Sequence, residues 1–302
     1  MDVINKPSGL VGIMVEEVAQ FTSPDIIEGI VCRLEDFGYK SVIADLRLYS
    51  RWSDKWFDNE AMMDELLSSY LNDISKQKID GLIYVAAHAR NVTKIPEDFP
   101  IPSVMIYSNE MNPKVPSVML DDDISAFKAV RYLIDKGHRK ITIAAGEANN
   151  IHTQQRLEGA YRALELIGIT REKARVIYAG WVRESGYRNA EEILKDGSTA
   201  VFCMSDRQAG GLYKYMYEHG IRPGEDISVI GFDNAELSQF LMPGLTTMSL
   251  PLRMMGNTSV KLLMGMLRDN GHFDPEDEIV KIPCPILERN SVAVIPGVPP
   301  VE

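Results

Sequence analysis

The sequence predicts an α/β protein built as two doubly wound parallel-sheet lobes joined by a three-crossover hinge. Two observations predict this fold class. Short apolar runs typical of buried parallel strands alternate with amphipathic helical patterns along the whole chain. A chain of 302 residues, 45% of them hydrophobic, is also long enough for two domains with sizeable cores.

The first set of elements predicts one doubly wound half. It opens with a strand at 10–15 and a helix that Ser23 can cap, with Pro24 at its first position and Gly38 after its end. The predicted buried stripe of this helix is Ile26, Ile27, Ile30, Val31, Leu34 and Phe37. The other elements of this half are strand 41–44, helix 59–75, strand 81–85 and strand 103–107.

The connection at 46–59, LRLYSRWSDKWFDN, is longer than strand-to-helix connections normally are. It is also aromatic, with Tyr49, Trp52, Trp56 and Phe57. Two interpretations stay open: a loop that packs its own hydrophobic side chains, or a lid or dimer contact.

A second doubly wound half follows Pro113 and Pro116. Its first helix is entered at Asp121-Asp122-Asp123 and ended by Gly137. The predicted strands are 118–120, 140–145, 174–178, 200–203 and 227–231. The other predicted helices are 154–167, 184–194 and 207–219.

A final helix at 252–267 and an extended segment at 279–287 are expected to return to each half in turn. The predicted N-terminal lobe is therefore 1–117 plus 249–276. The predicted C-terminal lobe is 118–248 plus 277–295, with 296–302 as a tail. Crossings are expected near 108–115, 246–249 and 274–278, and multiple crossings of this kind form a hinge.

Composition limits the possible partners. The net charge is −11 and no Lys/Arg-rich stretch occurs, so nothing in this chain marks a nucleic-acid surface. Cys32, Cys203 and Cys284 lie far apart in apolar runs, which suits buried side chains in a reducing compartment. We find no signal peptide and no 18-residue apolar run, so we expect a cytoplasmic protein without a membrane partner.

Polar residues at the predicted strand ends are the first site candidates. Ser205 and Asp206 follow one buried strand, and Asp233 follows the next, where an open parallel sheet binds ligands. The alternative is that each aspartate caps the helix after it. Arg156 and Trp181 complete a set suited to hydroxyl-rich ligands, because an arginine fork holds vicinal hydroxyls and an aromatic face covers a sugar ring. Arg156 could equally be a solvated helix charge and Trp181 a partly buried core residue.

Several motifs are absent from the sequence. No Gly-x-Gly-x-x-Gly follows the first strand, and no phosphate loop or Gly-x-Ser-x-Gly elbow occurs. The five histidines show no metal-ligand spacing. We therefore expect no cofactor, no metal site and no enzyme activity.

Six motifs together resemble the effector-binding core of the lactose-repressor/galactose-repressor (LacI/GalR) family of bacterial transcription regulators, over essentially the whole chain. They stand in that family's order and near its spacing. They are the stretch from Tyr132 to Ile141, the stretch from Arg156 to Leu164, Trp181 to Tyr187, Ser205-Asp206, Pro223 to Asp233, and Pro243-Gly-Leu-Thr-Thr.

The resemblance implies two periplasmic-binding-protein-like lobes, a small effector in the cleft between them, and a homodimer. By position it implies effector contacts from Arg156, Trp181, Ser205, Asp206 and Asp233. In the first lobe it implies contacts from Glu17, Phe21, Ser23 and Tyr107. The function it implies is a sensor in which binding of a small effector, expected to be a sugar, changes operator affinity.

Two departures and one rival accompany the resemblance. The family carries a helix-turn-helix headpiece before the first strand, whereas this chain reaches that strand within its first ten or so residues. We therefore expect operator DNA to be bound only through a headpiece missing here. The chain is then either a fragment of a repressor, which we favour, or a naturally headless relative. The aromatic insertion at 46–59 is the second departure. The rival is a periplasmic-type sugar-binding protein of a transport system, which is expected to be a monomer with an export signal.

Overall fold

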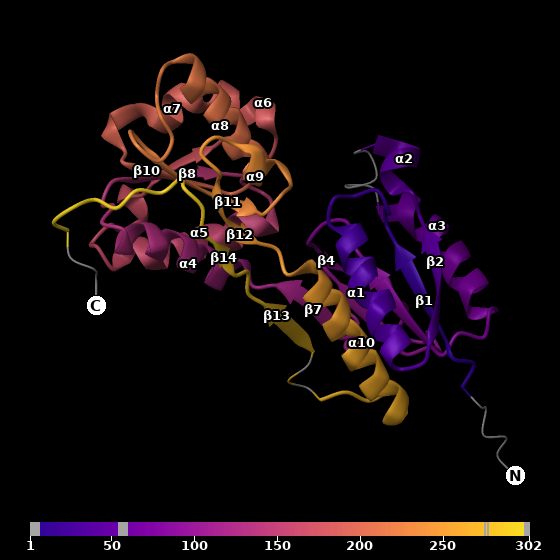
Figure 1. Cartoon of the computed structure of the whole chain (residues 1–302). Coiled ribbons are helices and arrows are strands. Elements are labelled where there is room, and N and C mark those ends of the chain that lie inside the picture. Colours follow the sequence, from indigo (N-terminus) through magenta and orange to yellow (C-terminus); the bar gives the residue numbers. More distant parts are fainter. Residues whose placement is uncertain (1–6, 54–59, 275, 277, 299–302) are drawn as a thin grey trace, which may run out of the picture. The chain divides into compact units, whose positions relative to one another are not determined.

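The computed structural model describes residues 7–53, 60–274, 276 and 278–298, and it divides into two compact units. The first unit takes the chain up to Leu120 together with Pro251–Ile282. The second takes Asp121–Leu250 and the chain from Pro283 onward. Each unit contains one six-stranded sheet with helices packed on it (Figure 1). This is the predicted fold class.

The first unit holds a wholly parallel sheet in the order β13-β7-β5-β3-β1-β2. Its strands are β1 (Leu10–Val15), β2 (Lys40–Asp45), β3 (Gly81–Val85), β5 (Ser103–Ile106), β7 (Ser117–Leu120) and β13 (Ile279–Ile282). The helices α1 (Ser23–Asp36) and α10 (Leu252–Arg268) pack on each other and on one face of the sheet, and α3 (Glu60–Ser75) covers the other.

A small two-stranded sheet and a short helix in the first unit were not predicted from the sequence. A short parallel pair, β4 (Asn91–Val92) and β6 (Asn109–Glu110), lies beside the main sheet. The helix α2 (Leu48–Trp52) occupies the start of the aromatic insertion and carries Tyr49 and Trp52. The rest of that insertion, including Trp56 and Phe57, lies outside the described residues.

The second unit holds a sheet in the order β14-β12-β11-β10-β8-β9, in which only β14 runs antiparallel. Its strands are β8 (Ile141–Ala145), β9 (Arg175–Tyr178), β10 (Ala200–Cys203), β11 (Ser228–Asp233), β12 (Thr246–Ser249) and β14 (Ile286–Leu287). Its α-helices are α4 (Asp122–Asp135), α5 (Ile151–Glu165), α6 (Arg183–Arg188), α7 (Ala190–Leu194), α8 (Asp206–Glu218) and α9 (Leu237–Phe240). Two 3₁₀ turns span Arg171–Lys173 and Lys195–Gly197.

The chain crosses between the units later than the predicted boundaries place it. Strand 118–120 was assigned to the second half, but β7 pairs with β5 of the first sheet through Ile106 and Val118. Segment 277–295 was assigned entirely to the second lobe, but β13 pairs with β7. The first unit therefore extends to Leu120 and includes the chain up to Ile282, because β7 and β13 are hydrogen-bonded into its sheet. Sequence patterns locate a strand but do not show which sheet it joins.

The first helix differs from its predicted capping and stripe. Helix α1 begins at Ser23 itself, and the residue before it, Thr22, makes no side-chain capping bond. Phe37 is 44% exposed, and it lies outside the helix, as the residue that follows its last position at Asp36. Cys32 is exposed on the opposite side of the same helix, whereas Cys203 and Cys284 are buried as predicted.

The predicted helix 184–194 is split at Asn189 into α6 and α7. Asn189 leaves the helical backbone region with ψ near 5°, and its Nδ2 donates to the Ser185 carbonyl at 2.9 Å. This side-chain bond competes with the helical ladder, which is a general reason why Asn weakens helix interiors.

Packing between α1 and α10 depends on glycine. A Cβ at Gly256 would lie 2.3 Å from the Ile26 carbonyl oxygen, a backbone atom that cannot move aside alone. Gly256→Ala is therefore expected to lower the free energy of unfolding by about 1–3 kcal/mol, measured by urea titration. Gly265→Ala, on the same helix with nothing within 4 Å, should raise it by about 0.5–1 kcal/mol. Equal effects at the two positions would contradict this packing.

Neither a membrane span nor a metal cluster is found in the part of the chain that the structure describes. None of its helices is long and apolar enough to cross a membrane. The same residues contain no group of three His, Cys, Asp or Glu side chains arranged to hold a metal ion.

Candidate effector site

The candidate site of the second unit lies at the carboxyl edge of its sheet. The chain runs from β8 outward to β9 and then returns to the other side of β8 as β10, so the strand order reverses at β8. Ligands of open α/β sheets bind outside the strand ends at such a reversal. The loops after β8, β9, β10 and β11 carry the candidate residues to this edge.

Arg156 is the centre of the site. It lies on α5, whose N-cap Asn150 accepts hydrogen bonds from the backbone of His152 and Thr153. The side chain is only 2% exposed. Its guanidinium donates from Nε to Asp122 at 2.7 Å and from Nη1 to the Met204 carbonyl at 2.5 Å. Arg156 is therefore a buried, paired charge, and its interpretation as a solvated helix charge is wrong.

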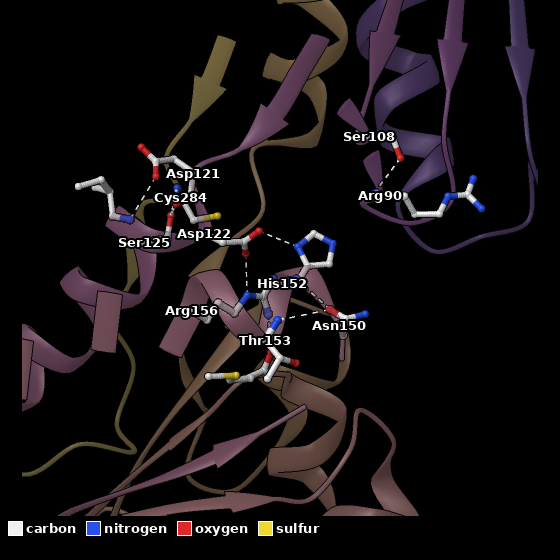
Figure 2. A network of polar contacts seen from close by, with 12 residues as sticks. Arg90, Ser108, Asp121, Asp122, Ser125, Asn150, His152, Thr153, Arg156 and Cys284 are labelled. Carbon is white, nitrogen blue, oxygen red and sulfur yellow. Dashed lines mark hydrogen bonds and ion pairs between the residues drawn. The ribbon is translucent and has the colours of Figure 1, made fainter. Parts of the chain in front are cut away.

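Asp122 joins Arg156 to His152 (Figure 2). Its Oδ2 lies 2.6 Å from Nδ1 of His152 and its Oδ1 accepts from Arg156. Burial opposes ionisation of Asp122, but His152 and Arg156 outweigh it and hold the pKa of this carboxyl well below its usual range. The sequence indicated only that the three aspartates at 121–123 begin a helix.

Two aromatic rings flank the guanidinium. Phe232 of β11 lies 3.6 Å from the Arg156 Cζ and Trp181 lies 5.6 Å from it, measured to the ring centroids. Trp181 is partly buried and packs against Gly146 after β8, where an added Cβ would approach the Trp181 ring to 2.2 Å. The strand ends thus hold a cation over two aromatic rings, a stabilising arrangement.

Ser205 and Asp206 organise the loops around the site. The Ser205 Oγ donates to the Trp181 carbonyl at 2.8 Å and accepts from the Gln208 backbone as the N-cap of α8. Asp206 is fully buried, and its oxygens accept from the Ala235 backbone at 2.8 Å and from the Thr247 hydroxyl at 2.7 Å. The capping interpretation of Asp206 is therefore wrong, because the N-cap of the helix after it is Ser205.

Asp233 stands at the end of β11 in an unusual backbone conformation. Its φ is 116° and that of Asn234 is 55°, two consecutive positive values in residues other than glycine. Arg289 holds this turn by donating to the Asn234 Oδ1 at 2.9 Å. Backbone strain that the surroundings enforce in this way is concentrated at functional sites.

Burial raises the pKa of Asp233 to about 7, although Arg156 and Arg207 oppose the shift. The pKa of the neighbouring Asp206 is also raised, by burial and by the charge of Asp233. Two carboxylates near one another in a dry site resist ionising together.

This shift sets a pH dependence of stability. The pKa of the Asp233 carboxyl is about 7 in the folded chain and near 3.9 when the chain is unfolded. Ionisation of Asp233 therefore lowers the free energy of unfolding, and this loss develops as pH rises from about 4 to 7. Asp233→Asn is therefore expected to stabilise the protein by roughly 1–3 kcal/mol at pH 8 and to have no effect near pH 4, measured by urea titration.

Asp226 serves as a control whose pKa is shifted in the opposite direction. It is exposed, and hydrogen bonds from Arg222 lower its pKa to about 2. Asp226→Asn should therefore lose stability at pH 8. An Asp233→Asn variant that is no more stable than the original chain at pH 8 would contradict the assignment.

The first-unit candidates lie at the carboxyl edge of their own sheet, but they are not equally available. Glu17 is buried and accepts from the backbone and hydroxyl of Ser50, each at 3.0 Å, so it anchors α2. Ser23 is fully buried in the first turn of α1. Phe21 is 42% exposed, and Tyr107 follows β5 with φ 72°.

Sequence reasoning missed the neighbouring Glu16. This buried carboxylate accepts from the Tyr84 hydroxyl at 3.0 Å and from the Ala87 backbone at 2.7 Å, and it pairs with Arg90. Side chains alternate in direction along an extended segment, but the sequence does not show which of the two consecutive glutamates after β1 faces Tyr84 and Arg90.

A cavity of about 540 Å³ lies at the opposite edge of the first sheet. Its walls are the segments that precede β5, β7 and β13 and the end of α10, with Phe99, Pro100, Val115, Met266 and Phe273 among them. The candidate residues of the second unit lie instead at the carboxyl edge of their own sheet, together with the buried charges of Asp122 and Arg156 and the strained backbone at Asp233.

The comparisons with known proteins agree with this architecture. Residues 130–292, more than half of the chain, match the periplasmic binding protein-like domain. The chain is 25% identical to the HTH-type transcriptional repressor PurR of Vibrio atlanticus over 289 residues, covering 94% of this chain and 81% of that protein. It is 27% identical over 288 residues to the HTH-type transcriptional repressor CytR of Escherichia coli, covering 94% of this chain and 79% of that one.

A solved structure agrees as well. A LacI-family transcriptional regulator from Rhizobium etli superposes with a TM-score of 0.79 at 25% identity, covering 95% of this chain and 99% of that one. The matching domain, the repressor relatives and the shared fold together show that the chain belongs to the periplasmic binding protein-like family and is an effector-binding core of the LacI/GalR type.

Proposed function

We propose that this chain senses a small hydroxyl-rich effector, a sugar, through Arg156, Trp181 and Asp233, and that binding changes the operator affinity of a regulator. The observation that carries this proposal is the Arg156 guanidinium fixed close to the rings of Phe232 and Trp181 at the strand ends. A fixed planar donor can hold paired hydroxyls, and an aromatic face suits the C–H side of a sugar ring.

Ser205 and Asp206 act indirectly in this proposal. Their oxygens are engaged with Trp181, Ala235 and Thr247, so they hold the loops that present Trp181 and Asp233. The first-unit residues Glu17, Phe21, Ser23 and Tyr107 stay predictions. Because Glu17, Ser23 and Tyr107 are buried, Phe21 is the better first target there.

Solved relatives support the ligand class. A LacI-family regulator from Enterococcus faecium was crystallised with bound ribose, and the regulator CelR was solved as a cellobiose complex. The relatives PurR and CytR are repressors, which favours regulation over transport or catalysis for this chain. By the same relatives we propose a soluble, DNA-binding regulator.

A thermal-shift screen against ribose, cellobiose, other sugars, sugar phosphates and purines tests the proposal. A ligand at about 100 times its Kd should add roughly 2.7 kcal/mol, which raises the Tm by several degrees. Trp181→Ala should abolish the shift, since it removes the proposed stacking face. A shift that survives Trp181→Ala would place the ligand elsewhere, and no shift with any compound would argue against the proposal.

We also propose that the protein is a homodimer. The lac repressor was solved as a dimer bound to operator. In this chain Phe240 and Met242, beside α9, are 70% and 87% exposed, and adjacent apolar side chains at that exposure suit a protein interface. Met242→Glu is therefore expected to shift the mass measured by light scattering from dimer toward monomer. Leu166→Glu, 40% exposed at the end of α5, should leave the mass unchanged.

A further inference from the structure

Asp122 holds the effector-site arginine from a rigid support. It occupies the first turn of α4, where the N-cap Asp121 accepts from the Ile124 backbone. The Ser125 hydroxyl donates to the Asp121 carbonyl at 2.5 Å and accepts from the Cys284 backbone at 2.8 Å. Asp122 is therefore fixed by its own helix start and by the segment that enters the second unit at Pro283 (Figure 2).

Both oxygens of Asp122 are used, each for a different partner. One accepts from Arg156 Nε and the other meets His152 Nδ1, and all three side chains are at least nine-tenths buried. Charge-assisted hydrogen bonds of this kind are short and directional, so they set the plane of the guanidinium as well as neutralising it. The Met204 carbonyl contact and the Phe232 ring complete the orientation.

We propose that Asp122 is a positioning residue of the effector site, which acts through Arg156 and sets the guanidinium plane that the effector meets. This inference rests on the proposed effector-binding role of Arg156. A functional group whose orientation is locked by neighbouring hydrogen bonds binds its ligand without the cost of ordering.

The adjacent Asp123 provides a matched control. It pairs with Arg162 at 2.7 Å across the same two helices, but both side chains are 40% or more exposed. Asp122→Asn keeps the shape of the side chain and removes its charge, and Asp123→Asn makes the same change one residue away.

The first experiment measures orientation without a ligand. In ¹⁵N-labelled protein the Nε–Hε resonance of Arg156 is identified by its loss in Arg156→Lys, and its exchange with solvent is measured. We expect exchange at least ~10-fold faster in Asp122→Asn and unchanged in Asp123→Asn. Unchanged exchange in Asp122→Asn would overturn the proposal.

The second experiment measures coupling in calorimetric titrations with D-ribose and with cellobiose. We expect Asp122→Asn to weaken binding by about 10- to 100-fold and Asp123→Asn by less than about two-fold. In the Arg156→Lys background Asp122→Asn should add nothing further, because its effect passes through the arginine. If the two substitutions weaken binding by factors that multiply in the double variant, Asp122 does not act through Arg156 and has only a structural role. If neither sugar binds the original chain, these titrations count against the proposed effector class, and the exchange measurement alone decides the role of Asp122.

Discussion

Arg156→Ala is expected to destabilise the second unit by about 3–5 kcal/mol, because it leaves the buried carboxylate of Asp122 without its arginine partner. Arg156 is 2% exposed and paired on two sides, so its removal affects folding. Urea titration measures the effect.

Two further variants separate the charge from the packing. Arg156→Ala combined with Asp122→Asn should recover part of the lost stability, because the stranded charge is gone. Arg162→Ala removes the exposed partner of Asp123 and should cost less than about 1 kcal/mol. An Arg156→Ala variant as stable as Arg162→Ala would show that the Asp122 pair contributes little.

Asp206→Ala is the second large effect. It should cost about 2–4 kcal/mol, because the Ala235 N–H and the Thr247 hydroxyl would lose their buried acceptor. Asp206→Asn should cost much less, since burial raises the pKa of Asp206 and a neutral side chain is tolerated there. Equal losses in the two variants, measured by urea titration, would contradict this account.

The strands and the helix ends could be predicted because they depend on local sequence patterns. Apolar runs located β1, β3, β8, β10 and most of the other strands, and Gly38 and Gly137 ended their helices as predicted. The lobe boundaries were misplaced because β7 and β13 are assigned by hydrogen bonding to strands far away in the chain.

Some residues of the candidate site could be predicted from local patterns and others could not. Residues at strand ends, such as Asp206 and Asp233, could be located because a parallel sheet gathers its carboxyl ends at one edge. The pairing of Asp122 with Arg156, 34 residues later, could not, since it depends on how α4 and α5 pack. Close approach of these helices requires Gly159, where a Cβ would meet the Asp123 carbonyl at 1.9 Å.

The sensing role that we propose requires that effector binding favours one arrangement of the two units. A ligand shifts such an equilibrium only by its different affinity for the two arrangements. The native Cys32 is exposed on α1, and Tyr217 of α8 is 86% exposed, so Tyr217→Cys allows one spin label on each unit. Labelled protein diluted into an excess of unlabelled protein gives the distance within one chain.

That distance distribution, measured by pulsed electron resonance with and without a saturating sugar from the thermal-shift screen, is the most direct test. Our account predicts that the sugar narrows the distribution and moves its maximum, and that Arg156→Lys abolishes the change. An identical distribution with the sugar fully bound would contradict a sensing role.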